Sequence, residues 1–191
     1  MEEKNKAWKT VSSKYLFRRP WLTVRCEDML LPNGNHIPEY YILEYPDWVN
    51  TIAITKEGKF VFVRQYRPGI GRTCYELCAG VCEKEDVSPL VSAQRELWEE
   101  TGYGNGNWQE YMVVSANPST HTNLTHCFLA TDVELIDHQH LEATEDISVH
   151  LFTLEEVRTL LENNEIMQSL NAAPLWKYMA SPVSYTHLTL P

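Results

Sequence analysis

The segment Arg95-Glu-Leu-Trp-Glu-Glu-Thr-Gly102 carries three carboxylates within five residues, those of Glu96, Glu99 and Glu100. Side chains three and four residues apart are neighbours on a helix, so all three would share one face and repel each other. Arg95 is expected to hold Glu99, which leaves Glu96 and Glu100 facing each other without a cation. Mg²⁺ binds such oxygen ligands and keeps positions for water and phosphate, so the pattern favours a metal site, with an acidic surface turn as the alternative.

A helix that would carry these carboxylates is expected between Ser88 and Gly102. Ser88 is a good N-cap residue, and Pro89 suits the first helical position. Gly102 suits the helix end. Apolar and small residues recur with helical spacing along this segment, at Leu90, Ala93, Leu97 and Thr101.

Strand-like segments surround this helix. A hairpin is expected from two β-rich stretches, 21–31 and 40–45, around the turn residues Pro32-Asn-Gly34. Further strands are expected at 49–54, 59–64, 75–78, 108–115, 125–130 and 147–152, and closing helices at 154–163 and 165–179. Pro174 should kink or split the last helix. The chain is therefore predicted to be an α+β protein with a mixed sheet.

The composition excludes some classes of partner. The 191 residues carry a net charge of −10, which argues against a surface that coats nucleic acid. No apolar run approaches the roughly 20 residues that span a bilayer, so no membrane partner is expected. Five cysteines, an odd number, and an N-terminus without a signal-like apolar stretch are typical of reduced thiols in the cytoplasm. Residues 183–191 resemble a translated sequencing adapter and are expected to take no part in the fold, a natural disordered tail being the alternative.

The segment Arg95–Tyr103 resembles the second half of the Nudix box, G-x5-E-x7-R-E-U-x-E-E-x-G-U, in which U is a bulky apolar residue. Every fixed position from Arg95 onward is matched. Gly80 lies one residue further upstream than in that motif, so the first glutamate of the box has no clean counterpart, and Glu85 or Asp86 is the nearest carboxylate.

Other segments resemble the ADP-ribose pyrophosphatase branch of that family. Glu76-Leu-Cys-Ala-Gly80 resembles its E-L-P-A-G segment, with Cys78 in place of proline. Val63-Arg-Gln-Tyr-Arg67 resembles its V-x-Q-Y-R strand, and Glu145–His150 resembles the acidic segment before its last strand. The resemblance covers about residues 11–180.

The resemblance implies a Nudix fold, in which helices sandwich a mixed sheet (α/β/α). It also implies an N-terminal β-hairpin region, residues 1–45, that makes a homodimer, and a hydrolase domain at residues 46–182. The implied reaction is Mg²⁺-dependent hydrolysis of the pyrophosphate bond of a nucleoside diphosphate sugar, with Mn²⁺ as a possible substitute. The alternatives are another substrate, such as GDP-mannose or a dinucleoside polyphosphate, and a ligand sensor without catalysis.

The resemblance also implies roles for single residues. Glu96, Glu100 and the carbonyl of Ala79 would bind the metal, and Glu99 would bind it or accept Arg95. The general base would be Glu145 or, as second choice, Glu142, although either could simply cap the following strand. The implied substrate-binding residues are Arg67 for a phosphate, Trp21 for adenine, with Tyr40 or Tyr41 as the opposing ring, and additionally Arg64 and Glu76. A buried core position is the alternative for Trp21.

Overall fold

The computed structural model describes residues 6–181, so the predicted adapter-derived tail at 183–191 lies outside the described residues. Contacts divide the chain into two units. The first comprises Met1–Pro46 and Ser115–Asn123, and the second comprises Asp47–Val114 and Leu124–Pro191.

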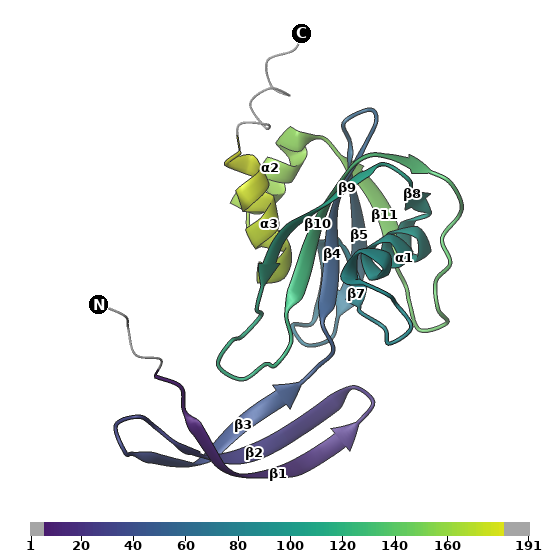
Figure 1. Ribbon diagram of the computed structural model, residues 1–191. Helices are drawn as coiled ribbons and strands as arrows, with labels where there is room; N and C mark the ends of the chain where they lie inside the picture. Colours follow the sequence, from purple (N-terminus) through teal and green to yellow (C-terminus); the bar gives the residue numbers. More distant parts are fainter. Residues whose placement is uncertain (1–5, 182–191) are drawn as a thin grey trace. The chain divides into compact units, whose positions relative to one another are not determined.

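The first unit is a three-stranded antiparallel sheet in the order β1-β2-β3, formed by Lys9–Arg19, Leu22–Leu30 and His36–Glu44 (Figure 1). The predicted hairpin is confirmed as β2 and β3, with Gly34 at a φ of 87° in the connecting turn. Strand β1 was not predicted. Every residue of β1 is exposed, so its sequence carries no alternation between a buried and a solvated face.

The second unit is built on an eight-stranded mixed sheet. Its strands are β4 (Trp48–Thr55), β5 (Phe60–Arg67), β6 (Arg72–Glu76), β7 (Cys78–Val81), β8 (Tyr103–Gly104), β9 (Asn107–Val114), β10 (Thr125–Leu135) and β11 (Ser148–Phe152). The central path runs β11-β5-β4-β10-β8, with β6 on β5, β7 on β4 and β9 on β10. Strands β4 and β10 are parallel and the other pairs are antiparallel.

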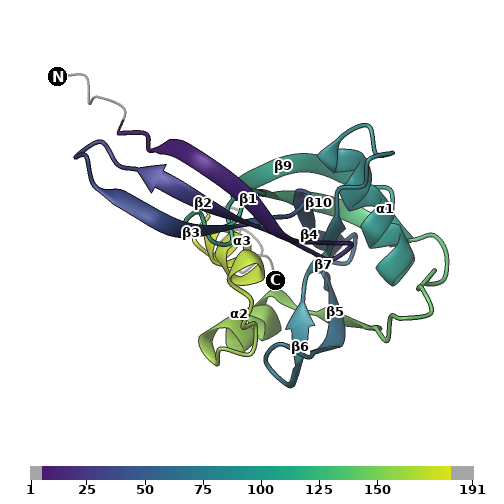
Figure 2. The same cartoon turned by 90° about the horizontal axis from the view of Figure 1, so that it is seen from below.

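Helix α1 (Pro89–Thr101) covers one face of this sheet, and α2 (Leu154–Glu162) and α3 (Ser169–Met179) cover the other (Figures 1 and 2). Alternation along the central strands explains the two layers. Ala53 and Val61 pack with Leu97 of α1, whereas Ile52 and Phe62 belong to the larger cluster with α2 and α3. The predicted α+β fold with a sandwiched mixed sheet is confirmed.

The mixed sheet opens between β4 and β5. These strands pair only at Ala53 and Ile54, because β7 pairs with the first half of β4 and β6 with the second half of β5. The single strand predicted at 75–78 is therefore wrong. At Leu77, which is 1% exposed, the chain leaves its pairing with β5 and begins to pair with β4. As a result β7 lies against α1.

Helix α1 forms as predicted. The Ser88 side chain accepts a hydrogen bond from the Val91 N–H at 3.4 Å, and Gly102 ends the helix with a φ of 75° and an N–H bonded to the carbonyl of Trp98. Its buried face includes Leu97 and, near the C-terminal end, Glu100. One of the three clustered carboxylates therefore points into the protein.

The closing helices differ in part from the prediction. Helix α2 has a full capping box at Thr153, but α3 starts at Ser169 instead of Glu165. The preceding segment is not helical and places Ile166 in the core at 4% exposure. Pro174 does not split α3. The carbonyl of Leu170, which Pro174 cannot bond, instead accepts the side-chain amide of Asn50 at 2.8 Å.

All five cysteines lie in the described part of the chain and none is in a disulfide. Among residues 6–181, no helix combines the length and the apolar character that crossing a bilayer requires.

Candidate active site

The carboxylates of Glu96 and Glu100 lie against β7. The Glu96 carboxylate occupies the space above Gly80, where any Cβ would collide with it. The backbone N–H of Ala79 donates to Glu100 Oε2 at 3.1 Å. The glycine and the two glutamates are therefore parts of one arrangement, in which an ordinary side chain at position 80 would displace Glu96.

Arg95 organises the outer side of this arrangement. Its Nη1 donates to Glu96 Oε1 and to Glu99 Oε2, each at 3.0 Å, and its Nη2 donates to Asp86 Oδ2 at 3.0 Å. The predicted Arg95–Glu99 contact is confirmed. The expectation that Glu96 has no cation is wrong, because the guanidinium lies between the two glutamates and contacts both.

Of the two carboxylates nearest to the first glutamate position of the motif, Asp86 is the one that contacts Arg95. Besides Arg95, it accepts the hydroxyl of Ser92 at 2.8 Å and the N–H of Glu83 at 3.2 Å. The hydrogen bond from Arg95 is the main cause that lowers the pKa of Asp86. Glu85, the other candidate, is exposed.

Among the three clustered carboxylates, burial has its largest effect on the pKa of Glu100. It is 4% exposed, and burial raises its pKa to about 8, with the charges of Glu96 and Glu145 adding to the rise. Burial also raises the pKa of Glu96, although Arg95 opposes the shift. Buried carboxylates that lack full compensation favour a bound cation, and an all-oxygen donor set fits Mg²⁺. The residues present therefore fit a hard divalent metal.

The loop between β10 and β11 brings Glu145 towards this group. The negative charge of Glu145 contributes to the rise in the pKa of Glu100. Glu145 accepts the backbone N–H of Glu142 at 2.8 Å, and both side chains are exposed. The side chain of Gln139 ties the loop to the helix end by donating to the carbonyls of Glu100 at 2.7 Å and Ile147 at 3.2 Å.

Arg67 and Glu76 form an ion pair at the opening of the sheet. Arg67 Nε donates to Glu76 Oε1 at 2.8 Å and Gln65 Nε2 donates to Glu76 Oε2 at 3.4 Å. Glu76 is 2% exposed, whereas the Arg67 side chain is 41% exposed. The hydrogen bond to Glu76 is the largest cause that raises the pKa of Arg67, and the charge of Glu100 contributes. Glu76 is therefore placed to hold Arg67, and Arg67 lies near the carboxylates.

Arg64 is not brought to this group. It pairs with Tyr75 in the β5–β6 ladder, one register position from the Val63–Glu76 pair, so its side chain points to the other face of the sheet. Its guanidinium carbon lies 5.3 Å from the centre of the Tyr75 ring. Tyr75 itself packs against the core cluster beneath α2 and α3.

Trp21 belongs to the first unit and lies in the turn between β1 and β2. It is 84% exposed, so the alternative of a buried core tryptophan is wrong. Tyr41 is 45% exposed, and Tyr40 packs edge-on against Trp8 with ring centres 5.5 Å apart. Trp21 and Tyr41 are therefore accessible to a ligand or a partner, whereas Tyr40 is engaged by Trp8 and by the carbonyl of Ser119.

A cavity of about 360 Å³ adjoins the opening, lined by Arg67, Ala79 and Gly80 together with residues of β4, β10 and α3. Its lining includes three side-chain oxygens that are buried and have no hydrogen-bond partner in the described structure, namely Asn50 Oδ1, Thr125 Oγ1 and Asn171 Oδ1. None of these residues was a sequence candidate. The sequence signal that could have identified Asn50 is its polar side chain inside a strand with apolar residues such as Val49 and Ile52.

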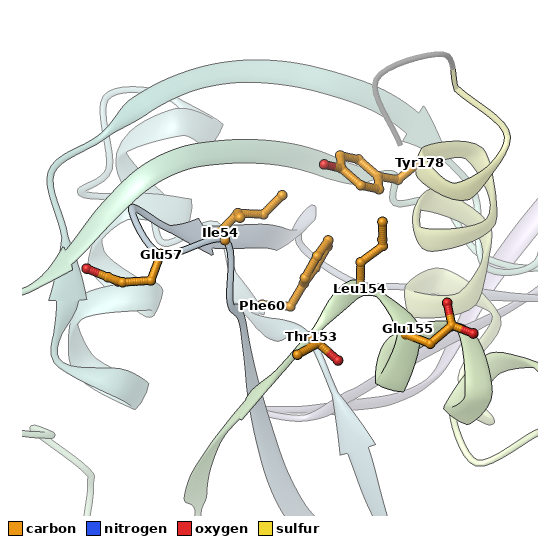
Figure 3. A pocket seen from close by; sticks show the side chains of 8 residues that line it. Ile54, Glu57, Phe60, Thr153, Leu154, Glu155 and Tyr178 are labelled. Carbon is orange, nitrogen blue, oxygen red and sulfur yellow. The ribbon is translucent and has the colours of Figure 1, made fainter. Parts of the chain in front are cut away.

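A second cavity, of about 320 Å³, lies on the face covered by α2 and α3 (Figure 3). Its lining is formed largely by Ile54, Phe60, Leu154 and Tyr178, and includes no residue predicted to bind metal or substrate. The candidate site therefore comprises the end of α1, the β6–β7 crossing, the loop before β11 and the cavity beside Arg67.

Comparison with known proteins identifies related families and folds. The nucleoside diphosphate sugar hydrolase N-terminal domain matches residues 8–43, and the NUDIX domain matches residues 45–172. The chain is 32% identical to the ADP-ribose pyrophosphatase of Bacillus subtilis over 86% of this chain and 88% of that protein. It is 26% identical to the ADP-ribose pyrophosphatase of Mycobacterium tuberculosis over 87% and 80%.

Two further relatives extend the comparison. The methanol dehydrogenase activator of Bacillus methanolicus is 30% identical over 84% of this chain and 86% of its own length. A crystal structure of an ADP compounds hydrolase superimposes with a TM-score of 0.78 at 20% identity, covering 90% of this chain and 94% of that one. At that identity the superposition shows a shared fold.

Proposed function

The chain belongs to the Nudix family, and we propose that it hydrolyses the pyrophosphate bond of a nucleoside diphosphate sugar, with ADP-ribose as the first candidate. The products would be a nucleoside monophosphate and a sugar phosphate. Two relatives named ADP-ribose pyrophosphatases support this substrate class. The observation that carries the proposal is the placement of Glu96 and Glu100 against Gly80 and Ala79, two residues that line one cavity together with Arg67.

Glu96 and Glu100, with Glu99 and the carbonyl of Ala79, would hold Mg²⁺, and Mn²⁺ would substitute because it accepts the same oxygen ligands. Bound there, the ion would supply positive charge to the pyrophosphate and to the attacking water. The raised pKa of Glu100 supports a cation at this position. We expect excess EDTA to abolish hydrolysis and Mg²⁺ to restore it, and full activity in EDTA would contradict the assignment.

We propose the remaining roles for Glu145, Glu142, Glu76 and Arg67. Glu145 would take a proton from the attacking water, since its carboxylate is exposed on the loop and its charge acts on that of Glu100. Glu142 is the second choice for this base. Glu76 engages Nε and Nη2 of Arg67, which leaves Nη1 for a phosphate oxygen.

The cavity beside Arg67 would receive hydroxyl groups of the substrate. The buried oxygens of Asn50, Thr125 and Asn171 are acceptors, and sugar hydroxyls are donors that would satisfy them. Thr125→Val removes one acceptor while preserving the shape of the side chain. We expect it to raise KM about 5–10-fold, the loss of roughly one hydrogen bond, with kcat nearly unchanged.

The N-terminal region, residues 1–45, would act as a dimerisation element for the hydrolase domain at 46–182. Strand β1 exposes Val11, Tyr15, Leu16 and Phe17, a surface that a second copy would cover. Trp21, at 84% exposure, would stack on the adenine ring. Light scattering after size-exclusion chromatography would test the dimer, and a monomer at micromolar concentration would contradict it. The protein is expected to act in the cytoplasm, where its thiols stay reduced.

The substrate class is tested directly with a panel of compounds in the presence of Mg²⁺. Release of AMP from ADP-ribose, faster than release of GMP from GDP-mannose or cleavage of a dinucleoside polyphosphate, is the expected result. Failure to hydrolyse any member of the panel would contradict the proposed activity.

A further inference from the structure

Three potential metal ligands converge immediately after β10, outside the carboxylate site. Asp137, His138 and His140 place one ligand atom each within 4.8 Å of one another. Asp137 Oδ1 lies 2.7 Å from His138 Nδ1, and Asp137 Oδ2 lies 3.0 Å from His140 Nε2. We propose that these three side chains bind a divalent transition metal, of the Zn²⁺ or Ni²⁺ type, as a site separate from the Mg²⁺ site.

The backbone that carries these ligands is fixed to the end of α1. The N–H groups of Ile136 and Asp137 both donate to the carbonyl of Gly102, at 2.9 and 3.1 Å. The N–H of His140 donates to the carbonyl of Glu99 at 2.8 Å. A Cβ at position 102 would collide with the carbonyl of Asp137, so Gly102 permits this close approach. The ligands are therefore presented by an anchored segment.

The imidazole of His140 is itself oriented by packing. Its ring stacks on Trp98 with centres 4.0 Å apart and an angle of 27° between the planes. The His138 ring lies 4.4 Å from the His140 ring, so both imidazoles face the same carboxylate. Preorganised ligands of this kind lose little conformational entropy when a metal binds.

The separations between ligand atoms are close to those of a metal centre. In a tetrahedral Zn²⁺ site with bonds of about 2.0 Å, neighbouring ligand atoms lie about 3.3 Å apart. The distances of 2.7 and 3.0 Å join a different Asp137 oxygen to each imidazole, and one ligand atom from each residue lies within 4.8 Å of the others, so a shared metal requires a small rearrangement of these side chains. His138 is 79% exposed at its side chain, which leaves solvent access for the remaining coordination position.

The donor set selects the class of metal. Imidazole nitrogen suits Zn²⁺, Ni²⁺ and Cu²⁺, whereas Mg²⁺ prefers oxygen alone. Elsewhere on the surface a carboxylate contacts a single imidazole: His36 Nδ1 lies 3.2 Å from Asp28 Oδ1. Asp137 differs because it contacts two imidazoles. The pair of His36 and Asp28, with no third ligand in its group among the described residues, provides a matched control.

The position of this site connects it to the catalytic loop. Gln139, between the two histidines, bonds the carbonyl of Glu100 at the end of α1 and the carbonyl of Ile147, which closely follows Glu145 in the chain. A metal at Asp137, His138 and His140 would therefore hold the beginning of this loop against α1.

Titration calorimetry with Ni²⁺ on untagged protein tests the site without relying on hydrolysis. Glu96→Gln/Glu100→Gln serves as the background, because it removes the ligands proposed for Mg²⁺. One Ni²⁺ should bind per chain in this background, with a Kd on the order of 10 µM or lower. His138→Ala should weaken binding at least about 100-fold, more than the loss of an outer partner usually costs, and His36→Ala should change nothing.

Two results would overturn the site. One is the absence of Ni²⁺ binding in the background, and the other is an unchanged Kd after His138→Ala. If the background variant does not fold, the same titration is made on wild-type protein with excess Mg²⁺ occupying the carboxylates. His138 is exposed, so its replacement should leave the circular dichroism spectrum and the melting temperature unchanged. These outcomes are independent of which nucleotide the enzyme hydrolyses.

Discussion

Two buried glutamates on opposite sides of the same opening have contrasting partners. Glu76, 2% exposed at the end of β6, receives the guanidinium of Arg67 and the amide of Gln65. Glu100, 4% exposed at the end of α1, receives the backbone N–H of Ala79, and its pKa is raised to about 8. A buried carboxylate that is paired with a guanidinium has a structural role, because each group fixes the other. A buried carboxylate without such a partner is a candidate for binding a cationic ligand.

The difference arises from how each residue is positioned. The β5–β6 ladder sets Glu76 opposite Val63, on the face from which Arg67 and Gln65 also project. Glu100 is placed by the packing of α1 on β7, and the guanidinium of Arg95 on the same helix is already occupied by Asp86, Glu96 and Glu99. The carboxylate of Glu76 therefore has a cation within the protein, whereas that of Glu100 would gain one by binding the metal.

The strongest test of this contrast is Glu100→Gln. It should retain the fold, because the amide oxygen can still accept the Ala79 N–H, and lower kcat by ~10²–10³-fold, the scale of losing one key electrostatic group. Steady-state kinetics at saturating Mg²⁺ measures the effect. The Glu99 side chain is 34% exposed and bonded to Arg95, so Glu99→Gln should lower kcat less than Glu100→Gln does. A decrease below tenfold for Glu100→Gln would mean that Glu100 is not a metal ligand.

The next largest effect is expected at the loop that influences Glu100. Glu145→Gln should lower kcat by at least ~10²-fold with little change in KM, as expected for a general base. Affinity for Mg²⁺, measured by calorimetry, should be unchanged, which separates this variant from Glu100→Gln. If Glu142→Gln is the crippled variant instead, the base is in this loop but at the other position. If both retain full turnover, the base lies outside the loop.

The local signals of the site could be predicted from sequence. Glu96, Glu99 and Glu100 repeat at helical spacing, and Ser88 and Gly102 delimit their helix, so chemistry and scaffold lie in one continuous segment. The fold class was predictable for a similar reason, since β4 and the first half of β5 are short runs of buried residues on either side of the turn at Glu57 and Gly58.

The long-range parts could not be predicted. The partnership of Arg67 with Glu76 depends on the register between two strands, and the contact of Glu96 with Gly80 depends on the crossing at Leu77. The absence of a split at Pro174 depends on Asn50, which is 124 positions away. Nothing local to Asn50 indicates that its amide completes the hydrogen bonding of α3.

An intermediate effect is expected when the ion pair between Arg67 and Glu76 is removed. Arg67→Met should lower kcat/KM by at least ~10-fold through the loss of a phosphate contact. It should also destabilise the protein by about 1–3 kcal/mol, less than a fully buried pair because the Arg67 side chain is 41% exposed. Urea unfolding and kinetics measure the two effects separately.

Two variants resolve the roles within this pair. Arg67→Met/Glu76→Gln should recover much of the stability, since no buried charge is left, but not kcat/KM. Arg64→Met, on the other sheet face, should leave kcat/KM within about twofold. An equal kinetic loss for Arg64→Met would place the phosphate on that face and contradict the assignment of Arg67.

The smallest expected effect concerns the stability of the metal-free protein. The folded-state pKa of Glu100, about 8, exceeds the ordinary 4.5, so the folded state binds the proton more tightly than the unfolded state. Stability should therefore fall as pH rises from about 4.5 to 8, and Glu100→Gln should escape this loss. In EDTA at pH 8 the variant should melt a few degrees higher than wild type, with about 2–4 °C for each kcal/mol. At pH 5 the difference should vanish, and Mg²⁺ at pH 8 should raise the melting temperature of wild type alone. A variant that melts lower than wild type in EDTA at pH 8 would show that the Glu100 carboxylate is satisfied without a metal, as that of Glu76 is.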